Sequence, residues 1–463
     1  MKWQQVMAAA VSATMILSLA ACGGSGKNGG SGGDVTDVKY ADIKLGEDYT
    51  DLKADLKMMT NRTDMLDEGY TGEKTWAQYL EEFNKEYPDI KVDIEGITDY
   101  SEDSLLRLQG GDWGDIMMIP EVDKSDLSTY FLSYGDVDSV SEQVKYPNRW
   151  LYDGEVYGLP ITAVGRGIVY NKRVFSEAGI TSAPKTPEEF LEALKKLKGK
   201  TQAPLYTNYA AGWTMGAWDD YTAVAATGDG TFRNQKLVHA KAPFSDPGDG
   251  TGAYNVYKIL YDAVEQGLTE DDFSTTDWEG SKNMLNSGQI GCMVLGSWAY
   301  PQVKSAGDKG EDIGYMPFPM TIGGKQYSPA DEDYCFGINV SSSADNQTAA
   351  LVFVKWMTEK SGYSYNEGGL PLAVGDENYP EVYDEFLANN VEFVSNEPAL
   401  EGEEDTLNEL NADSELMVAA NGNDKIQEIV EHASNKDKSF DDIMKEWNQK
   451  WSDAQEMDGV EVK

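Results

Sequence analysis

Four short segments place aromatic or hydrogen-bonding side chains directly after an apolar, strand-like run. They carry Asn61, Arg62 and Asp64 after 54–60, Glu121 and Asp123 after 115–120, Tyr209 and Trp213 after 205–206, and Trp298 after 290–295. In open α/β sheets, ligands bind beyond the carboxyl ends of the strands. Rings that stack on C–H faces, together with carboxylates and amides that bond hydroxyls, favour a neutral polyhydroxylated ligand such as a sugar.

Catalytic and metal-binding signatures are weak in this sequence. The two histidines, His239 and His432, lack the spacing of zinc ligands. A G-x-S-x-G occurs at 29–33, but in a Gly/Ser-rich stretch without the strand–turn–helix context that activates a nucleophile. No phosphate-binding G-x-x-x-x-G-K-[ST] is present. We therefore predict no catalysis, no cofactor and no metal site, although an acidic loop could hold calcium without an obvious motif.

The first 22 residues have the features of a targeting segment. Lys2 precedes an apolar run that ends in Leu19-Ala20-Ala21-Cys22, which resembles a bacterial lipobox. We expect Cys22 to be lipidated and to anchor the protein on the outer face of the cytoplasmic membrane; an ordinary cleaved signal is the alternative. Residues 23–37, rich in glycine and serine at their start, are predicted to form a flexible tether.

The composition limits the partners and the number of domains. The 38 Lys and Arg residues against 80 Asp and Glu give a net charge of −42, which argues against nucleic acid and anionic lipid surfaces as partners. The roughly 440 residues after the targeting segment exceed what one hydrophobic core usually supports, so two domains are expected. Besides Cys22, only Cys292 and Cys335 remain, and both are predicted to be free and buried.

The elements that must position these side chains alternate between strands and helices. Strand patterns cover 54–60, 90–97, 115–120 and 290–295, and helix patterns cover 75–87, 186–198, 254–266 and 347–360. Thr75 with Gln78 and Thr186 with Glu189 have the spacing of capping boxes. The pattern predicts an α/β fold with largely parallel sheets. The acidic tail from Glu392 onwards is predicted to be helical and peripheral.

Five segments together resemble the extracellular solute-binding proteins of bacterial ABC importers, specifically the carbohydrate-binding group. In chain order they are ADLKMMTNRTD (54–64), LQGGDWGDIMMI (108–119), DGEVYGLPITAVGRGIVYNKRVFSEAGI (153–180), the helix entered through Pro-Lys-Thr (184–186), and G-x-x-G-C-M-x-x-G-S-W (288–298). Cys292 stands where the family commonly has alanine. The resemblance covers nearly the whole chain after the targeting segment.

The resemblance implies a two-lobed, type II clamshell with a parallel-rich sheet in each lobe. Lobe 1 would comprise 38–161 plus 320–372, and lobe 2 would comprise 162–319 plus 373–463. The chain would cross between lobes near 159–163, 317–319 and 370–375. A carbohydrate, most simply a neutral oligosaccharide, would bind between the lobes, and the closed protein would dock on the permease subunits. The protein would act as a monomer, without nucleic acid.

The resemblance also assigns roles to individual residues. Trp298 matches the family's stacking tryptophan, and Gly296 before it is expected to let the backbone approach a neighbour closely. The remaining contacts implied are Asn61, Arg62 and Asp64; Glu121 and Asp123; Tyr209 and Trp213; and Asp331, Asp333 and Tyr334, with Trp218 and Trp278 as further candidates. Two alternatives stay open: the same fold binding a polyamine or small peptide, and a secreted glycosidase, since 80 acidic residues leave a carboxylate pair possible.

Overall fold

The computed structural model describes residues 35–420 and 422–463. The predicted targeting segment with Cys22 and most of the predicted tether lie outside the described residues. The chain from Asp34 to Lys463 forms one compact unit. Within the described part of the chain, no helix combines the length and the apolar character that a membrane crossing requires.

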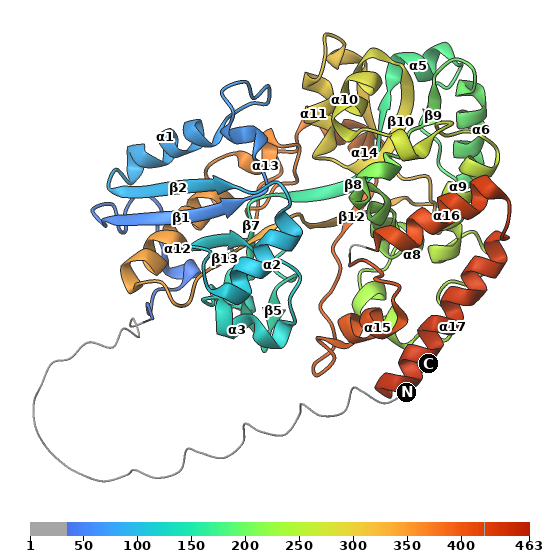
Figure 1. Ribbon diagram of the computed structural model, residues 1–463. Helices are drawn as coiled ribbons and strands as arrows, with labels where there is room; N and C mark the ends of the chain where they lie inside the picture. The colour runs from blue at the N-terminus through green and yellow to red at the C-terminus, as the bar shows by residue number, and fades with distance from the viewer. Residues whose placement is uncertain (1–34, 421) are drawn as a thin grey trace, which may run out of the picture. The chain divides into compact units, whose positions relative to one another are not determined.

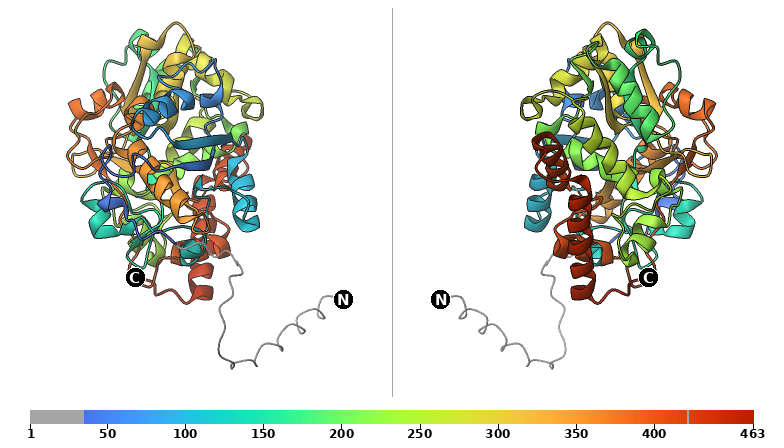
Figure 2. Two further views of the ribbon diagram at one scale, coloured as in Figure 1. Left: turned by 90° about the vertical axis from the view of Figure 1, so that its left-hand side faces the viewer. Right: turned by 90° about the vertical axis from the view of Figure 1, so that its right-hand side faces the viewer.

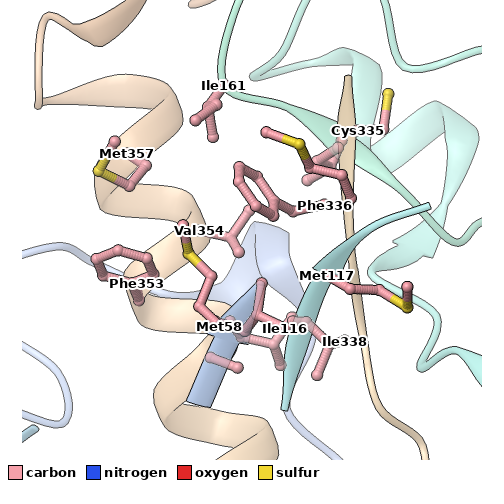
Figure 3. Close-up of a cluster of buried hydrophobic side chains, with 14 of the residues drawn as sticks. Met58, Ile116, Met117, Ile161, Cys335, Phe336, Ile338, Phe353, Val354 and Met357 are labelled. Carbon is pink, nitrogen blue, oxygen red and sulfur yellow. The ribbon is translucent and has the colours of Figure 1, made fainter. Parts of the chain in front are cut away.

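The first of two main sheets has the strand order β2-β1-β3-β13-β7 (Figure 1). Its strands are β1 (Ala54–Thr60), β2 (Ile90–Gly96), β3 (Ile116–Met118), β7 (Leu159–Pro160) and β13 (Cys335–Ile338). β1 is parallel to β2 and β3, whereas β13 is antiparallel to β3 and β7. Figure 3 shows Phe353, Val354 and Met357 of α12 (Ala344–Glu359) packed beside Met58 of β1, Ile116 of β3 and Phe336 of β13.

Smaller elements complete this first lobe. A three-stranded sheet has the order β4-β6-β5. The bounds are β4 (Gly135–Asp136), β5 (Leu151–Tyr152), β6 (Glu155–Val156), α1 (Trp76–Glu86), α2 (Tyr100–Gly110), α3 (Leu127–Tyr130), α4 (Val137–Ser141) and α13 (Tyr363–Asn366).

The second main sheet has the order β14-β12-β8-β10-β9, and β11 also pairs with β8. Its strands are β8 (Ala163–Asn171), β9 (Ala203–Leu205), β10 (Ile290–Gly296), β11 (Ile313–Pro317), β12 (Tyr327–Glu332) and β14 (Glu392–Val394). β8 is antiparallel to β10, β11 and β12, while β9 with β10 and β12 with β14 are parallel pairs. The α/β class is confirmed, but both sheets are mixed. Local periodicity indicates that a segment is a strand but not its direction, which depends on pairing with distant segments, such as that of β8 with β10, β11 and β12.

The C-terminal tail folds into helices that belong to the second lobe. They are α5 (Lys172–Glu177), α6 (Pro187–Leu197), α7 (Trp213–Gly216), α8 (Val224–Thr227), α9 (Gly252–Glu265), α10 (Trp278–Ser287), α11 (Ala299–Ser305), α14 (Asp384–Ala388), α15 (Thr406–Ser414), α16 (Asn423–Asn435) and α17 (Phe440–Asp458). The red helices α16 and α17 lie against α9 (Figures 1 and 2). The prediction of a peripheral tail was wrong, because Ile426, Trp447 and Trp451 are fully buried in the core of this lobe.

The chain passes between the two sheets three times. The first crossing, from β7 to β8, lies within 159–163 as expected. The return was expected at 317–319, but β12 still pairs with β8, so the chain returns at Asp333–Tyr334 between β12 and β13. It leaves the first lobe again after α13, and Leu370 forms a bridge with Ala163. The predicted division of the chain into lobes stays a prediction, and β12 argues for moving its boundary from 320 to 333.

One of the two predicted capping boxes is complete, and the two remaining cysteines are as predicted. The Thr75–Gln78 capping box is complete in both directions. At α6, Thr186 accepts a hydrogen bond from the backbone of Glu189, but the Glu189 carboxylate accepts from Lys185 instead of closing the box. Cys292 and Cys335 are free and buried, as predicted.

Candidate functional site

A small cavity lies where the two sheets and the crossing segments meet. Ten residues line it: Asn61, Arg62, Met118, Ile161, Thr162, Trp298, Asp333, Tyr334, Tyr363 and Glu367. The sheet of the first lobe supplies the ends of β1 and β3, the crossings supply 161–162 and 333–334, and the second lobe supplies Trp298 after β10. Five of the predicted contact residues are therefore brought together here.

The enclosed space is much smaller than an oligosaccharide. Its volume is about 40 Å³, whereas pockets for drug-sized ligands typically enclose roughly 300–1,000 Å³. A ligand larger than a few water molecules must therefore enter through a wider cleft, which requires the two lobes to separate.

Three tryptophans gather on the second-lobe side of the cavity. Trp298 lies 5.6 Å from both Trp213 and Trp278, measured between ring centroids, and Trp213 lies 5.3 Å from Trp278. Trp213 is 40% exposed, while Trp298 is half-buried. The cluster thus extends from the cavity wall at Trp298 to solvent at Trp213, as a surface on which more than one ring could stack.

Gly296 allows the indole of Trp298 to fold back over the end of β10. A Cβ atom at position 296 would lie 2.6 Å from Nε1 of Trp298 and 3.0 Å from Nη1 of Arg166. Any other residue would push the indole away from the strand end or displace Arg166. The expected close approach at Gly296 therefore serves to place Trp298.

Asp333 is a half-buried residue whose carboxylate lies among three guanidinium groups, and the ion pairs of those groups are made elsewhere. Arg62 pairs with Asp64 and Glu367, Arg149 with Glu121, and Arg166 with Asp220. Burial raises the pKa of Asp333, and the charges of Arg166, Arg149 and Arg62 oppose that rise. The carboxylate lines the cavity and is held through its backbone, which donates to Thr162 on the first crossing at 3.1 Å.

Asn61 also presents an acceptor to this region. Its Oδ1 atom is buried and has no hydrogen-bond partner within the described residues. Buried polar atoms are nearly always paired, so an unpaired oxygen in a cavity wall indicates a place for a ligand hydroxyl or a water molecule.

Other predicted contact residues do not line the cavity. Glu121 is exposed and paired with Arg149 at 2.7 Å, and Asp123 is exposed. Tyr209 packs on Phe273 and donates its hydroxyl to Glu431 of α16.

Two further predicted residues are committed to the fold of the second lobe. The Asp331 carboxylate accepts two hydrogen bonds from Asn396, at 3.0 and 2.8 Å. Trp218 is 2% exposed in the core beside Phe318, so in this conformation no ligand can reach it.

The sequence patterns missed half of the cavity wall. Ile161 and Thr162 lie in the predicted first crossing and could have been proposed on that ground. Tyr363 lies in the short helix α13 and Glu367 directly follows it, and nothing in the local sequence distinguishes them as ligand contacts from Tyr365 and Asn366 beside them. Among the described residues, no group of three or more His, Cys, Asp or Glu side chains is arranged to hold a metal ion.

Glu332, at the end of β12, makes stability depend on pH. Burial, followed by the charge of Asp331, raises its pKa from 4.5 to about 7, while Arg149 and Arg233 oppose the rise. The folded state therefore holds this proton more tightly than the unfolded state. The resulting stability is full below about pH 4.5 and is lost as the pH rises through about 7.

We expect Glu332→Gln to stabilise the protein more at pH 8 than at pH 5, by several degrees in melting temperature. Thermal unfolding of both proteins across this range measures the difference. Glu392→Gln, which removes the exposed carboxylate that pairs with Lys325, is the control and should leave the pH profile unchanged. Parallel profiles for wild type and Glu332→Gln would contradict the assignment.

A family model described as bacterial extracellular solute-binding protein matches residues 69–363 of the chain. The multiple sugar-binding protein of Streptococcus mutans is 26% identical over 313 residues, which cover 65% of this chain and 72% of that protein.

Two solved structures from Bifidobacterium animalis subsp. lactis are more similar. One is a manno-oligosaccharide-specific solute-binding protein in complex with mannotriose, with 50% identity and a TM-score of 0.88 over 91% of this chain and 99% of that chain. The other is a binding protein of an ABC transporter in complex with mannobiose, with 50% identity and a TM-score of 0.88 over 92% and 100% of the two chains.

Proposed function

The chain belongs to the family of bacterial extracellular solute-binding proteins, and from this premise we propose that it captures a neutral oligosaccharide for an ABC transporter. The ligand binds between the two lobes and is delivered unchanged to the permease subunits. Manno-oligosaccharides are the first candidates, because the two relatives at 50% identity are described in complex with mannotriose and mannobiose.

One observation carries this proposal: Trp298 shares a cavity with Asn61, Asp333 and Glu367. The apolar face of a sugar ring can stack on the indole while its hydroxyls donate to the amide and carboxylate oxygens. Stacking on an aromatic side chain contributes about 1–3 kcal/mol per ring in nucleic-acid complexes, and we expect a similar order here. Carboxylates in the wall disfavour uronic or phosphorylated sugars by charge repulsion.

Ligand capture in this proposal is a change in the separation of the lobes. The crossings at 159–163, 333–334 and 367–370 act as the hinge, and the cavity of about 40 Å³ represents a closed arrangement. A ligand shifts the equilibrium towards closure to the extent that it binds the closed form better. The permease then distinguishes the closed protein from the open one.

The anchor at Cys22 belongs to the same proposal. Lipidation at the lipobox-like sequence and the tether after it would hold a monomer at the outer face of the membrane, next to the permease. The family is extracellular, and the anchor with its flexible tether would limit how far the protein can move from the membrane.

Calorimetry and thermal shift of the purified protein test the ligand class. We expect mannobiose and mannotriose to bind and to raise the melting temperature, since a ligand at 100 times its Kd contributes about 2.7 kcal/mol. Spermidine, short peptides and galacturonic acid oligomers form the comparison set. Stabilisation by amines or peptides alone would contradict the carbohydrate proposal, and hydrolysis of the sugars on prolonged incubation would contradict the absence of catalysis.

A further inference from the structure

The guanidinium group of Arg62 has its N–H groups engaged within the protein. Nε and Nη2 donate to Asp64 at 3.0 and 2.9 Å, and Nη2 also donates to the Tyr70 hydroxyl at 3.0 Å. Nη1 donates to Glu367 at 2.7 Å and to the Tyr363 hydroxyl at 3.4 Å. Because a guanidinium carries five N–H groups, this set leaves Arg62 no donor for a ligand.

Glu367, unlike Arg62, can still form hydrogen bonds with a ligand, because its carboxylate has acceptor positions that no protein donor occupies. It is 4% exposed and lines the cavity. Its carboxylate accepts from Arg62 and from the Tyr70 hydroxyl, the latter at 3.0 Å to Oε1. An ionised carboxylate offers about four acceptor positions, so two donors leave about half of them for another partner.

Tyr70 remains a donor to Glu367 over the physiological pH range. Burial, followed by the charge of Glu367, raises the pKa of the Tyr70 hydroxyl well above its usual value. The hydroxyl therefore keeps its proton, accepts from Arg62 and donates to Glu367. The Glu367 carboxylate is thus held by two donors, Tyr70 and Arg62. Arg62 is itself held in place by Asp64.

The backbone after Glu367 places this carboxylate beside the loop of Trp298. Gly368 has a positive φ of 71°, and a Cβ atom there would lie 3.0 Å from the backbone oxygen of Ser297. The Tyr383 hydroxyl joins the two segments, with Ser297 Oγ at 2.8 Å and the Gly368 carbonyl at 3.2 Å. Glu367 and Trp298 therefore approach the same cavity from adjoining segments.

We propose that Glu367 accepts a hydrogen bond from a hydroxyl of the bound oligosaccharide, and that Arg62 is a positioning residue that fixes the Glu367 carboxylate. The inference rests on the proposed oligosaccharide capture. It assigns a contact to a residue that the sequence did not single out. It also changes the predicted role of Arg62, which acts on the ligand only through Glu367.

Calorimetry with mannobiose and its monodeoxy analogues tests both roles. The variants are Glu367→Gln, Arg62→Lys and their combination. Matched controls are Glu86→Gln and Arg107→Lys, which weaken the surface ion pairs Glu86–Lys360 and Arg107–Glu95 outside the cavity. A hydrogen bond to a charged group supports an expected loss of about tenfold or more for Glu367→Gln, while the controls stay within about twofold of wild type.

Two results separate contact from positioning. One monodeoxy mannobiose that binds wild type weakly should bind Glu367→Gln as well as mannobiose does, because its missing hydroxyl is the donor to Glu367. Arg62→Lys alone should weaken mannobiose binding. When it is combined with Glu367→Gln, the affinity for mannobiose should fall by less than about twofold below that of Glu367→Gln alone, since both changes act through one carboxylate.

The opposite results overturn the proposal. The role of Glu367 is wrong if every monodeoxy analogue loses as much affinity relative to mannobiose in Glu367→Gln as it does in wild type. The role of Arg62 is wrong if a crystal structure with mannobiose places a sugar oxygen within hydrogen-bond distance of an Arg62 nitrogen. Should Glu367→Gln fail to fold, Glu367→Asp keeps the charge, retracts the carboxylate and is judged by the same criteria. Failure of wild type to bind any neutral oligosaccharide would instead reject the proposed function, and this inference with it.

Discussion

Replacement of Trp298 by alanine is expected to reduce affinity for mannobiose or mannotriose by about 10- to 100-fold while the protein stays folded. The indole forms the second-lobe wall of the cavity and joins Trp213 and Trp278 in one aromatic cluster. Its removal takes away a stacking surface worth about 1–3 kcal/mol and the support that orients its two neighbours. Calorimetry measures the affinity.

The melting temperature of Trp298→Ala should fall by only a few degrees. Trp298 is half-buried, and its two aromatic contacts contribute about 0.5–1.5 kcal/mol each. Trp113→Ala is the matched control, because Trp113 is 4% exposed in the first-lobe core beside Phe131. That variant should lose about 3–5 kcal/mol of stability and keep its affinity once folded. Unfolding of Trp298→Ala with unchanged affinity in the folded fraction would make Trp298 a core residue.

Replacement of Lys425 by methionine is expected to destabilise the protein by about 3–5 kcal/mol. Lys425 and Asp219 form a buried ion pair between α16 and the segment after α7, with side chains 4% and 1% exposed. The Asp219 carboxylate also accepts from the Tyr257 hydroxyl at 2.7 Å and from the backbone of Ala419 at 2.9 Å. Loss of the ammonium leaves this carboxylate buried without its counter-charge. Thermal and denaturant unfolding measure the cost.

Two comparisons isolate the buried charge as the cause. Lys258→Met removes the partly exposed partner of Asp262, and we expect less than about 1 kcal/mol because surface pairs contribute little. Adding Asp219→Asn to Lys425→Met should recover part of the lost stability, because the uncompensated charge is gone. Equal losses from Lys425→Met and Lys258→Met would falsify the assignment.

The elements with strong periodic patterns were predictable from the sequence. β1 occupies 54–60 as predicted, and α1 begins after Thr75 with its complete capping box. These features depend on local spacing and on side chains that bond their own neighbours in the chain. Strand direction was not predictable in the same way, because β8 is antiparallel to neighbours that lie more than a hundred residues further along the chain.

Half of the residues that line the cavity were predicted from the sequence, because they lie in segments that a local pattern marks. Asn61 and Trp298 follow the carboxyl ends of β1 and β10, where the α/β fold presents side chains to a ligand. Both line the cavity. Trp218 is also a tryptophan of the second lobe, but it follows the helix α7 and not a strand, and it is buried in the core. Residue type alone does not distinguish these two tryptophans, since the direction of the side chain depends on packing against distant elements such as Phe318.

The sequence by itself determined the α/β class, the family and the tryptophan after β10, because each is a pattern of neighbouring residues. Only the tertiary structure decided which polar groups remain available to a ligand. Arg62 looked like a ligand donor until Asp64, Tyr70, Tyr363 and Glu367 were found around it, two of them some 300 residues away. Hydrogen-bond capacity is a property of all partners that surround a group in space, and those partners follow from the path of the chain.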